Sequence, residues 1–518
     1  MVRKTLVYYA LCIAFASWQT SASRGDVKLN PLFSEGMVLQ QGMRVPVWGT
    51  AASGEKVTVR FRGQEVSALP EKGKWMVHLE KLDPGGPFEM TVEGRNKFTF
   101  KNVLVGDVWI CSGQSNMEMT VRSSADFEKN IAQSKNPRIR LFTVAKNPSI
   151  TPQDRLGGGW SECNPDTVGG FSAVAYFFGR DLERAQQIPI GLIHTSWGGT
   201  PAEAWTSREA LSAEPSLKYM VDNTDRDVAA YPKEIEKHIQ ALQQYHAKTV
   251  EALAKHHDIA NPPNPPINWT KYAWGANSLY NGMIHPLLPY AITGAIWYQG
   301  ESNAGRAFEY RTLLATMITD WRKAWGQGDF PFLIVQLAPF QRIKPEPGES
   351  DWAELREAQL LMTKKLPKVG IAVITDVGHE TDIHPVWKEP VGARLALAAR
   401  ALAHDEKIVY SGPVYREMKI DGDRAILSFD HVGGGLVAKD GPVVGFTIAD
   451  EDHVFVKADA EIQGDQVIVR SSQVKSPVAV RYGWAAFPVV NLTNKEGLPA
   501  TPFRTDDFRL TTQRTAGQ

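Results

Sequence analysis

A serine at the end of an apolar run and a histidine far downstream are the residues of this chain best suited to covalent chemistry. Ser115 follows Trp109-Ile-Cys-Ser-Gly-Gln114, a pattern that predicts a strand ending in a tight turn with the serine at its tip. A serine hydroxyl is a weak nucleophile, so it needs a base and an acid that orients the base. The segment Glu380-Thr-Asp-Ile-His-Pro385 contains both residue types. This combination predicts a serine hydrolase that works through an acyl-enzyme.

His384 is the predicted general base, which takes the Ser115 proton and later returns it to the leaving alkoxide. Asp382 is the predicted acid that holds the imidazole in the right tautomer. Glu380 and Asp376 are alternative acids, and a Ser-His dyad completed by a backbone carbonyl is a third option.

Two other histidines compete with His384. His285 also precedes a proline but has no acid beside it, which favours a packed or supporting histidine. His379 fits a surface residue or a substrate contact.

The cysteines leave one question open. Cys111 has the residue type of a nucleophile, but a buried structural thiol is the better interpretation. An oxidising compartment would allow Cys111 to pair with Cys163, and a free buried thiol is equally compatible with the sequence.

Several motifs occur together in the order of one enzyme family. Gly113-Gln-Ser-Asn-Met117, Trp297-Tyr-Gln-Gly-Glu-Ser-Asn303 and Asp382-Ile-His-Pro385 resemble blocks of the sialate O-acetylesterase family within the SGNH (GDSL-type) serine hydrolases. Leu279-Tyr-Asn-Gly-Met-Ile-His-Pro286 agrees, as do segments near both ends, so the resemblance extends from about residue 26 to about residue 507. It implies Ser115 as the nucleophile, acetyl as the acyl group, and neither a cofactor nor a metal.

The ester carbonyl oxygen becomes an anion in the tetrahedral intermediate, so hydrogen-bond donors must face it. The backbone N–H of Ser115 is one predicted donor, and the turn Ser196-Trp-Gly-Gly-Thr200 offers Gly198 or Gly199 as the second. The resemblance assigns the third donor to the block that ends at Asn303, with the Gln299 side chain favoured and Asn303 second.

Polar residues beside these motifs are the candidates for substrate contacts. The predicted set is Gln114, Asn116, Glu301 and Arg306. Glu301 and Glu203 fit either a role in binding sugar hydroxyls or a role in locking loops.

The identity of the sugar is not decided by the sequence. Sialic acid carries a carboxylate, for which Arg306, Arg356 and Lys388 are candidate partners. Acetylated plant polysaccharides such as xylan or xyloglucan need no such charge. The predicted function is a carbohydrate O-acetylesterase, with sialic acid esters as the substrate by resemblance and plant polysaccharide as the alternative.

Other functional classes fit less well. A carbohydrate-binding protein with a silent hydrolase core is disfavoured because Ser115, His384 and an acid are all present. A thioesterase or lipase would need an apolar acyl slot or a lid, which the polar surroundings of the motifs do not indicate. The formal net charge of zero favours neither nucleic acid nor an anionic membrane as a partner, and no oligomeric state is predicted.

The elements that must position these residues follow from changes of pattern along the chain. Short alternating runs predict a β-sandwich-like domain over 24–104, and buried apolar runs alternating with helical patterns predict the catalytic domain over 105–405. Its parallel strands are expected at 108–110, 190–193, 291–298, 332–336 and 369–375. A second β-domain is expected over 406–518. With the resemblance, the fold class is α/β: an SGNH-type three-layer domain with a parallel sheet, flanked by N- and C-terminal all-β domains.

Two segments stand apart from these domains. Residues 1–23 have the basic start, short apolar core and small-residue end of a signal peptide, which predicts a secreted or periplasmic protein that has no membrane contact after cleavage. Residues 207–271 predict an inserted helical hairpin that ends in a Pro-rich extended loop. Its histidines are interpreted as solvated residues rather than metal ligands: His238, His246, His256 and His257.

Overall fold

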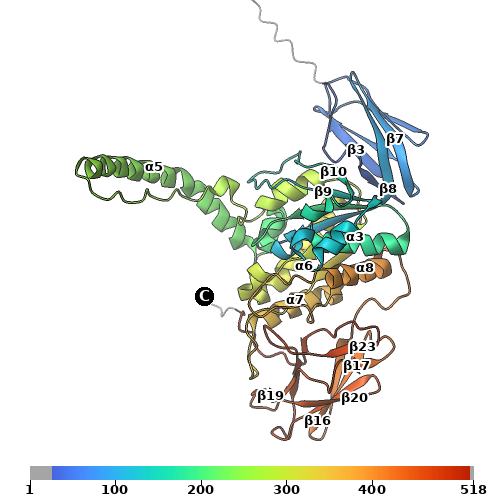
Figure 1. Cartoon of the computed structure of the whole chain (residues 1–518), viewed down its shortest axis with the longest axis vertical. Coiled ribbons are helices and arrows are strands. Elements are labelled where there is room, and N and C mark those ends of the chain that lie inside the picture. Colours follow the sequence, from blue (N-terminus) through green and yellow to red (C-terminus); the bar gives the residue numbers. More distant parts are fainter. Residues whose placement is uncertain (1–25, 514–518) are drawn as a thin grey trace, which may run out of the picture.

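The computed structural model describes residues 26–513, so the predicted signal peptide lies outside the described residues. An α/β body lies between two β-rich ends, and one long helix projects from its side (Figure 1). Within 26–513, no helix combines the length and the apolar composition needed to cross a membrane.

The central sheet has the strand order β10-β9-β11-β8-β12-β13-β14. Its strands are β8 (Lys97–Gly113), β9 (Asn136–Thr143), β10 (Trp160–Cys163), β11 (Ile190–Ser196), β12 (Gly294–Tyr298), β13 (Phe332–Val335) and β14 (Val369–Ala372). Every neighbouring pair is parallel except β10 and β9. The five predicted parallel strands are confirmed, whereas β9 and β10 were not predicted, because arginine and proline interrupt the apolar pattern of β9.

Helices cover both faces of this sheet. They are α3 (Ala173–Gln186) and α8 (Glu389–Ala403) on one face, and α6 (Ala307–Trp325) and α7 (Asp351–Lys365) on the other. Alternate residues of β8 point to the two faces, since Trp109 and Cys111 pack with α3 and α8 whereas Val108 and Ile110 belong to the core that includes α6 and α7. The result is a three-layer arrangement in which β8 is central.

Strand β8 also belongs to the N-terminal β-rich end. That end contains β1 (Lys28–Leu29), β2 (Val38–Gln40), β3 (Val45–Thr50), β4 (Val57–Phe61), β5 (Gln64–Ala68), β6 (Lys74–Leu79) and β7 (Gly85–Glu93). The first half of β8 pairs antiparallel with β7, and its second half pairs parallel with β11 and β12. The boundary predicted between residues 104 and 105 therefore falls inside one continuous strand, which joins the two parts without a linker.

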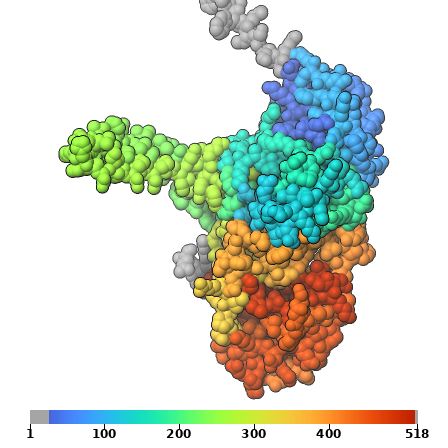
Figure 2. All heavy atoms as spheres, viewed as in Figure 1, coloured from blue at the N-terminus to red at the C-terminus, as the bar shows by residue number. Residues whose placement is uncertain are grey.

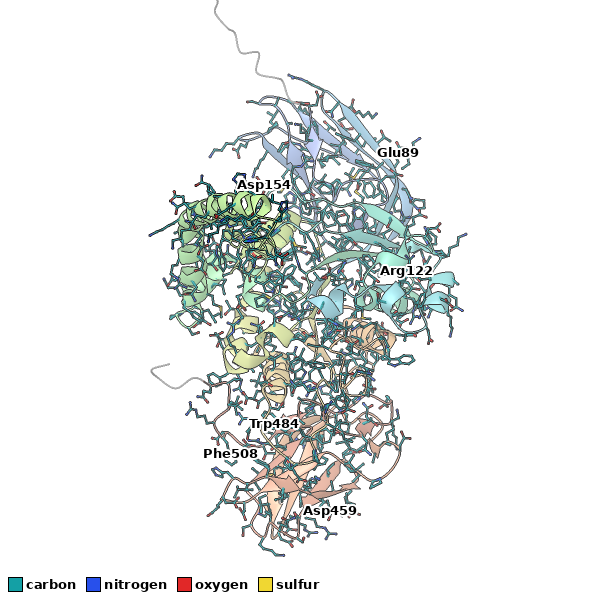
Figure 3. The ribbon with its side chains drawn as sticks, turned by 60° about the vertical axis from the view of Figure 1, so that its left-hand side comes forward. Glu89, Arg122, Asp154, Asp459, Trp484 and Phe508 are labelled. Carbon is teal, nitrogen blue, oxygen red and sulfur yellow. The ribbon has the colours of Figure 1, made fainter. Side chains whose placement is uncertain are left out.

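The C-terminal strands form small antiparallel sheets around their own core. They are β15 (Val414–Asp421), β16 (Arg424–Asp430), β17 (Leu436–Ala438), β18 (Phe446–Ala449), β19 (Val456–Lys457), β20 (Asp459–Gln463), β21 (Gln466–Arg470), β22 (Ala479–Tyr482), β23 (Leu492–Asn494) and β24 (Phe503–Arg504). Trp484 lies where these strands meet the body, whereas Asp459 lies toward their far end (Figure 3).

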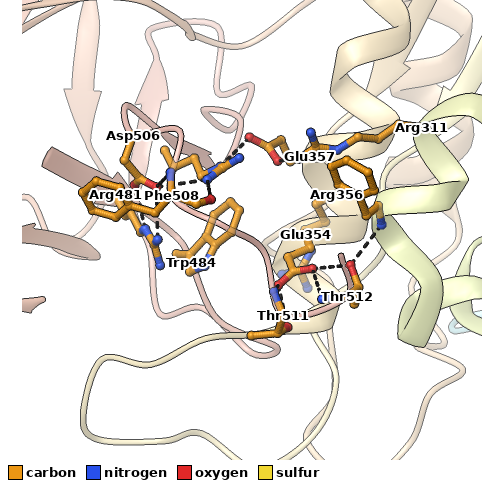
Figure 4. Close-up of polar contacts among 12 residues, drawn as sticks. Arg311, Glu354, Arg356, Glu357, Arg481, Trp484, Asp506, Phe508, Thr511 and Thr512 are labelled. Atoms are coloured by element: carbon orange, nitrogen blue, oxygen red, sulfur yellow. Dashed lines mark hydrogen bonds and ion pairs between the residues drawn. The ribbon is translucent and has the colours of Figure 1, made fainter. Parts of the chain in front are cut away.

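Helix α7 attaches the C-terminal strands to the body. Glu354 of α7 accepts hydrogen bonds from the hydroxyls of Thr511 and Thr512 (Figure 4). Arg356 is completely buried and donates to the carbonyl oxygens of Ala485 and Ala486 at 2.7 and 2.8 Å. Because these contacts replace water around buried charges, they hold the two parts in one orientation.

The insertion forms an arm that leaves the body (Figures 1 and 2). It consists of the short α4 (Arg208–Ala213), the 37-residue α5 (Lys218–Ala254) and a return segment that has no regular structure from Lys255 to Asn268. The predicted hairpin of helices is thus mainly one long helix with an extended return, because the proline-rich run 261–266 cannot continue a helix.

Candidate active site

Ser115 lies at the carboxyl end of the central strand. Gly113 ends β8 with a φ of +143°, and a Cβ there would lie 2.1 Å from the carbonyl oxygen of Tyr298, so only glycine fits this turn. Ser115 then begins the short helix α1 (Ser115–Glu118). After β8, the chain first adds β9, β10 and β11 on one side of that strand and then β12 on its other side. Ligands of open α/β sheets bind beyond the carboxyl ends of the strands at the place where the chain changes sides in this way.

His384 contacts Ser115 across the top of the sheet. Its Nε2 lies 2.8 Å from Ser115 Oγ, and it comes from the loop between β14 and α8. Asp382 Oδ1 accepts the backbone N–H of His384 at 2.8 Å and lies 3.6 Å from His384 Nδ1. The structure therefore brings together the three residues predicted to act as nucleophile, base and acid.

The other acids and histidines considered for these roles lie elsewhere. Asp376 forms a two-pronged ion pair with Arg394 at 2.6 Å, and Glu380 accepts the backbone N–H of Ile343 at 3.0 Å. His285 Nδ1 bonds the carbonyl oxygen of Gln153 at 2.9 Å. His379 Nδ1 accepts the backbone N–H of Asp382 at 3.1 Å, so His379 shapes the catalytic loop and has no contact with Ser115.

Two of the predicted backbone donors have no acceptor among the described residues. The N–H of Ser115 has no acceptor within α1, because Ser115 is the first residue of that helix. The N–H of Gly199 has no hydrogen-bond partner among the residues that the structure describes. The N–H of Gly198 is donated to Glu118 Oε2 at 2.6 Å, so of the two glycines predicted as alternatives only Gly199 is available.

Gln299 and Asn303, the residues predicted to supply the third oxyanion donor, bond each other in the structure. Both side chains are buried, and Gln299 Nε2 donates to Asn303 Oδ1 at 2.7 Å and to the carbonyl oxygen of Thr200 at 3.2 Å. Asn303 Nδ2 donates to Glu203 at 3.0 Å. These amides hold the two flanking loops together. Both N–H groups of Gln299 Nε2 are committed, whereas Asn303 Nδ2 has one printed acceptor and keeps a second N–H group. Sequence order placed them near Ser115 but carried no information on where the amides point.

Asn116 is likewise occupied, contrary to its prediction as a substrate contact, whereas Glu301 uses Oε1 and its buried Oε2 has no partner among residues 26–513. Asn116 is buried and donates to Glu301 Oε1 at 2.6 Å and to the carbonyl oxygen of Ile383 at 3.0 Å, while its Oδ1 accepts from Lys388 Nζ. Burial raises the pKa of Glu301. Burial lowers the pKa of Lys388 to about 7, although the nearby Glu301 carboxylate acts in the opposite direction. Through Asn116, this network holds the backbone of Ile383, the residue before His384.

The cationic candidates for a sialic acid carboxylate are also committed. Arg306 is paired with Glu203 and with Glu309 at 2.5 and 2.7 Å. These internal ion pairs occupy the side chain that was also predicted to contact the substrate. Arg356 is buried against the C-terminal strands, and Lys388 is 1% exposed. Gln114 differs from these residues, since its Oε1 accepts the N–H groups of Gly300 and Ser302 while its Nε2 has no partner within 26–513.

The structure adds residues that the sequence reasoning missed. Trp274 is 41% exposed, and its Nε1 donates to the carbonyl oxygen of Gly199 at 2.7 Å. Glu118 connects Gly198 to Lys146, whose Nζ lies 2.5 Å from Glu118 Oε1 and 4.8 Å from the ring centre of Trp197. The position of Glu118 three residues after the serine was a usable signal, whereas Trp274 follows the return segment of the arm and gave none.

The two cysteines of the described residues are not paired. Cys111 and Cys163 are both buried free thiols, and burial raises the pKa of each. A nucleophilic role needs a thiolate, so these thiols suit packing. No three His, Cys, Asp or Glu side chains come together as metal ligands between residues 26 and 513.

Comparisons with known proteins show which proteins this chain resembles. A family model described as "Carbohydrate esterase, sialic acid-specific acetylesterase" matches residues 105–250 and 266–399. The sialate O-acetylesterase of Mus musculus is 31% identical over 90% of this chain and 92% of its own, and that of Homo sapiens is 28% identical over 95% of each. A carbohydrate acetylesterase from Xanthomonas citri has a solved structure that is 38% identical, with a TM-score of 0.79 over 93% of this chain and 100% of its own.

The fold, the serine-histidine contact and these relatives define a carboxylic ester hydrolase. The chain belongs to the carbohydrate esterase family of sialic acid-specific acetylesterases.

Proposed function

We propose that this chain removes O-acetyl groups from a carbohydrate through a Ser-His-Asp acyl-enzyme mechanism, with Ser115 as the nucleophile. The observation that carries the proposal is the 2.8 Å contact between Ser115 Oγ and His384 Nε2 at the carboxyl end of β8. That distance is within the range at which a base takes a hydroxyl proton.

In the first half-reaction, Ser115 Oγ attacks the acetyl carbonyl carbon and its proton moves to His384 Nε2. The N–H groups of Ser115 and Gly199 stabilise the resulting oxyanion. When the intermediate collapses, the bond to the sugar oxygen breaks and His384 gives that oxygen its proton. Acetyl-Ser115 remains.

In the second half-reaction, a water molecule attacks acetyl-Ser115 while His384 Nε2 accepts one of its protons. Collapse of this intermediate releases acetic acid, and His384 returns the proton to Ser115 Oγ. Asp382 stabilises the imidazolium formed in each half-reaction. Its 3.6 Å distance to Nδ1 is long for a hydrogen bond, as is common before substrate binds.

Sialic acid O-acetyl esters are the first substrate class, because the relatives with this function match nearly the whole chain. A neutral acetylated glycan, such as xylan or xyloglucan, is the second, and one observation favours it. Arg306, Arg356 and Lys388 are all committed to internal contacts, and Lys146 is paired with Glu118. In either case, Gln114 Nε2 and the exposed face of Trp274 are the proposed contacts to the sugar.

The division into domains and the localisation belong to the same proposal. An SGNH-type catalytic core over residues 105–405, with all-β domains at 24–104 and 406–518, is the proposed division of the chain. Secretion or periplasmic export rests on the signal-like residues 1–23.

Covalent labelling tests the nucleophile. The purified protein is treated with a serine-reactive fluorophosphonate and digested, and the modified peptide is identified by mass spectrometry. We expect modification of Ser115 and its loss after His384→Ala. Modification of another serine, or none in folded protein, would contradict the mechanism.

A further inference from the structure

The turn after β11 is fixed on both sides of the Gly199 N–H group. Trp274 Nε1 and Ser302 Oγ each donate a hydrogen bond to the carbonyl oxygen of Gly199 at 2.7 Å. On the other side, the N–H of Gly198 is donated to Glu118 Oε2 at 2.6 Å. Because the peptide groups before and after it are both held, the planar peptide group that carries the Gly199 N–H has little freedom to rotate.

Glu118 reaches this turn because it lies on the same short helix as the nucleophile. It follows Ser115 by three residues in α1, which places the two side chains on one face of that helix. A Cβ at Gly198 would lie 3.3 Å from Glu118 Oε2 and 3.3 Å from Ser115 Cβ. The backbone of Gly198 therefore lies against the nucleophile and the carboxylate together, so a negative charge lies close to the place where the oxyanion forms.

Lys146 offsets the charge of Glu118. Its Nζ lies 2.5 Å from Glu118 Oε1 and 4.8 Å from the ring centre of Trp197, the residue before Gly198. An unpaired carboxylate would repel the negative charge that develops in the transition state, whereas a neutralised pair repels it less. The side chains of Glu118 and Lys146 are 33% and 42% exposed, so water weakens this repulsion without removing it.

We propose that Glu118 and Lys146 are positioning residues for oxyanion binding. Glu118 holds the Gly198 N–H, so that the next N–H, that of Gly199, faces the oxyanion, and Lys146 neutralises Glu118. This inference rests on the proposed function, since it requires an oxyanion at Gly199. Both residues act through the turn and on charge that appears only in the transition state, so their loss should lower kcat and leave KM nearly unchanged.

Steady-state kinetics on a short acetyl ester tests the role of Glu118. Glu118→Ala frees the Gly198 N–H, so we expect kcat to fall about tenfold or more with little change in KM. Glu118→Gln keeps an oxygen acceptor for this N–H and should retain most of the activity. Glu496→Ala is the matched control, because Glu496 also accepts the N–H of a glycine, Gly434, at 3.0 Å in the C-terminal part of the chain. A wild-type kcat in Glu118→Ala, or an equal loss in Glu118→Gln, would overturn the positioning role.

Lys146→Met tests the neutralising role and leaves the Gly198 hydrogen bond in place. It leaves an unpaired carboxylate beside the oxyanion, so we expect kcat to fall about threefold at low ionic strength and less in about 1 M salt, which screens partly exposed charges. In a Glu118→Gln background there is no carboxylate, so Lys146→Met should change kcat little. The same loss in both backgrounds would overturn the neutralising role. Lys146→Met keeps the pair testable even if Glu118→Ala does not fold.

Ser115→Ala in the same assay separates this inference from the proposed function. Loss of hydrolysis in Ser115→Ala together with a wild-type kcat in Glu118→Ala would overturn the positioning role and leave the mechanism standing. A wild-type kcat in Ser115→Ala would contradict the mechanism itself, and with it the inference.

Discussion

His384 Nε2 lies 2.8 Å from Ser115 Oγ, although 269 positions separate the two residues in the chain. The central strand β8 ends at Gly113, two residues before Ser115, and the loop before α8 returns to the same edge of the sheet. We predict that His384→Ala lowers kcat for a short acetyl ester by about 10³-fold or more. His285→Ala is the matched control, because His285 also precedes a proline but bonds Gln153 instead. Equal loss in both variants would contradict the role of His384.

Asp382 is predicted to act as the orienting acid. Asp382→Asn should lower kcat by about 10- to 100-fold, less than for a buried triad acid, because the Asp382 side chain is 57% exposed and 3.6 Å from the imidazole. Glu380→Gln is the control and should change kcat little, since Glu380 bonds only the backbone of Ile343. Steady-state kinetics on one reporter ester compares them, and a larger effect from Glu380→Gln would reassign the acid.

Trp274 should affect both turnover and sugar binding. Trp274→Phe keeps a ring but removes the hydrogen bond to Gly199, so we expect a lower kcat with little change in KM. Trp274→Ala should also raise KM for an acetylated oligosaccharide, by about fivefold or more, but not for a small reporter ester. Phe308→Ala removes another exposed ring, on α6, and serves as control. An unchanged KM for the oligosaccharide in Trp274→Ala would remove Trp274 from the sugar site.

Lys388 gives a prediction about pH and stability. Burial lowers its pKa to about 7, whereas an unfolded chain keeps a lysine pKa of about 10.4. Between these values the unfolded chain binds a proton that the folded chain does not, so stability rises as the pH is raised. Between pH 7 and about pH 10, the free energy of unfolding of the wild type should therefore rise by about 3 kcal/mol relative to that of Lys388→Met.

Denaturant unfolding at the two pH values measures this difference. Lys72→Met is the control, because Lys72 is exposed and its removal should give a difference that does not depend on pH. If the difference in free energy of unfolding between the wild type and Lys388→Met is also the same at both pH values, Lys388 keeps an ordinary pKa in the folded protein.

The sequence was most informative where the backbone pattern alone decides the structure. Continuous apolar runs identified the parallel strands at 190–193 and 332–336, because strands buried on both faces need such runs. The same pattern missed β9, whose arginines are accommodated by polar partners that lie far away in the chain, such as Asn102. The continuity of β8 through the expected domain boundary was also not visible, since pairing partners are not encoded in a strand's own pattern.

The order of the motifs along the chain predicted where the site lies, but the direction of each side chain decides whether a residue belongs to the site. Ser115, His384 and Asp382 come together because each lies at the carboxyl edge of the sheet or on the loop that reaches it. Gln299 and Asn303 lie at the same edge and nevertheless point into the protein, where they bond each other. A single sequence does not distinguish these two directions, because both place a polar residue after a buried strand.

Acetate release tests the central claim most directly. The purified wild type and Ser115→Ala are compared on O-acetylated sialic acid and on acetylated xylan oligosaccharides, with enzymatic detection of free acetate. We predict release by the wild type from at least one of these substrates and loss of nearly all of it in folded Ser115→Ala. Undiminished release by Ser115→Ala, or none by folded wild type from either substrate, would contradict the account.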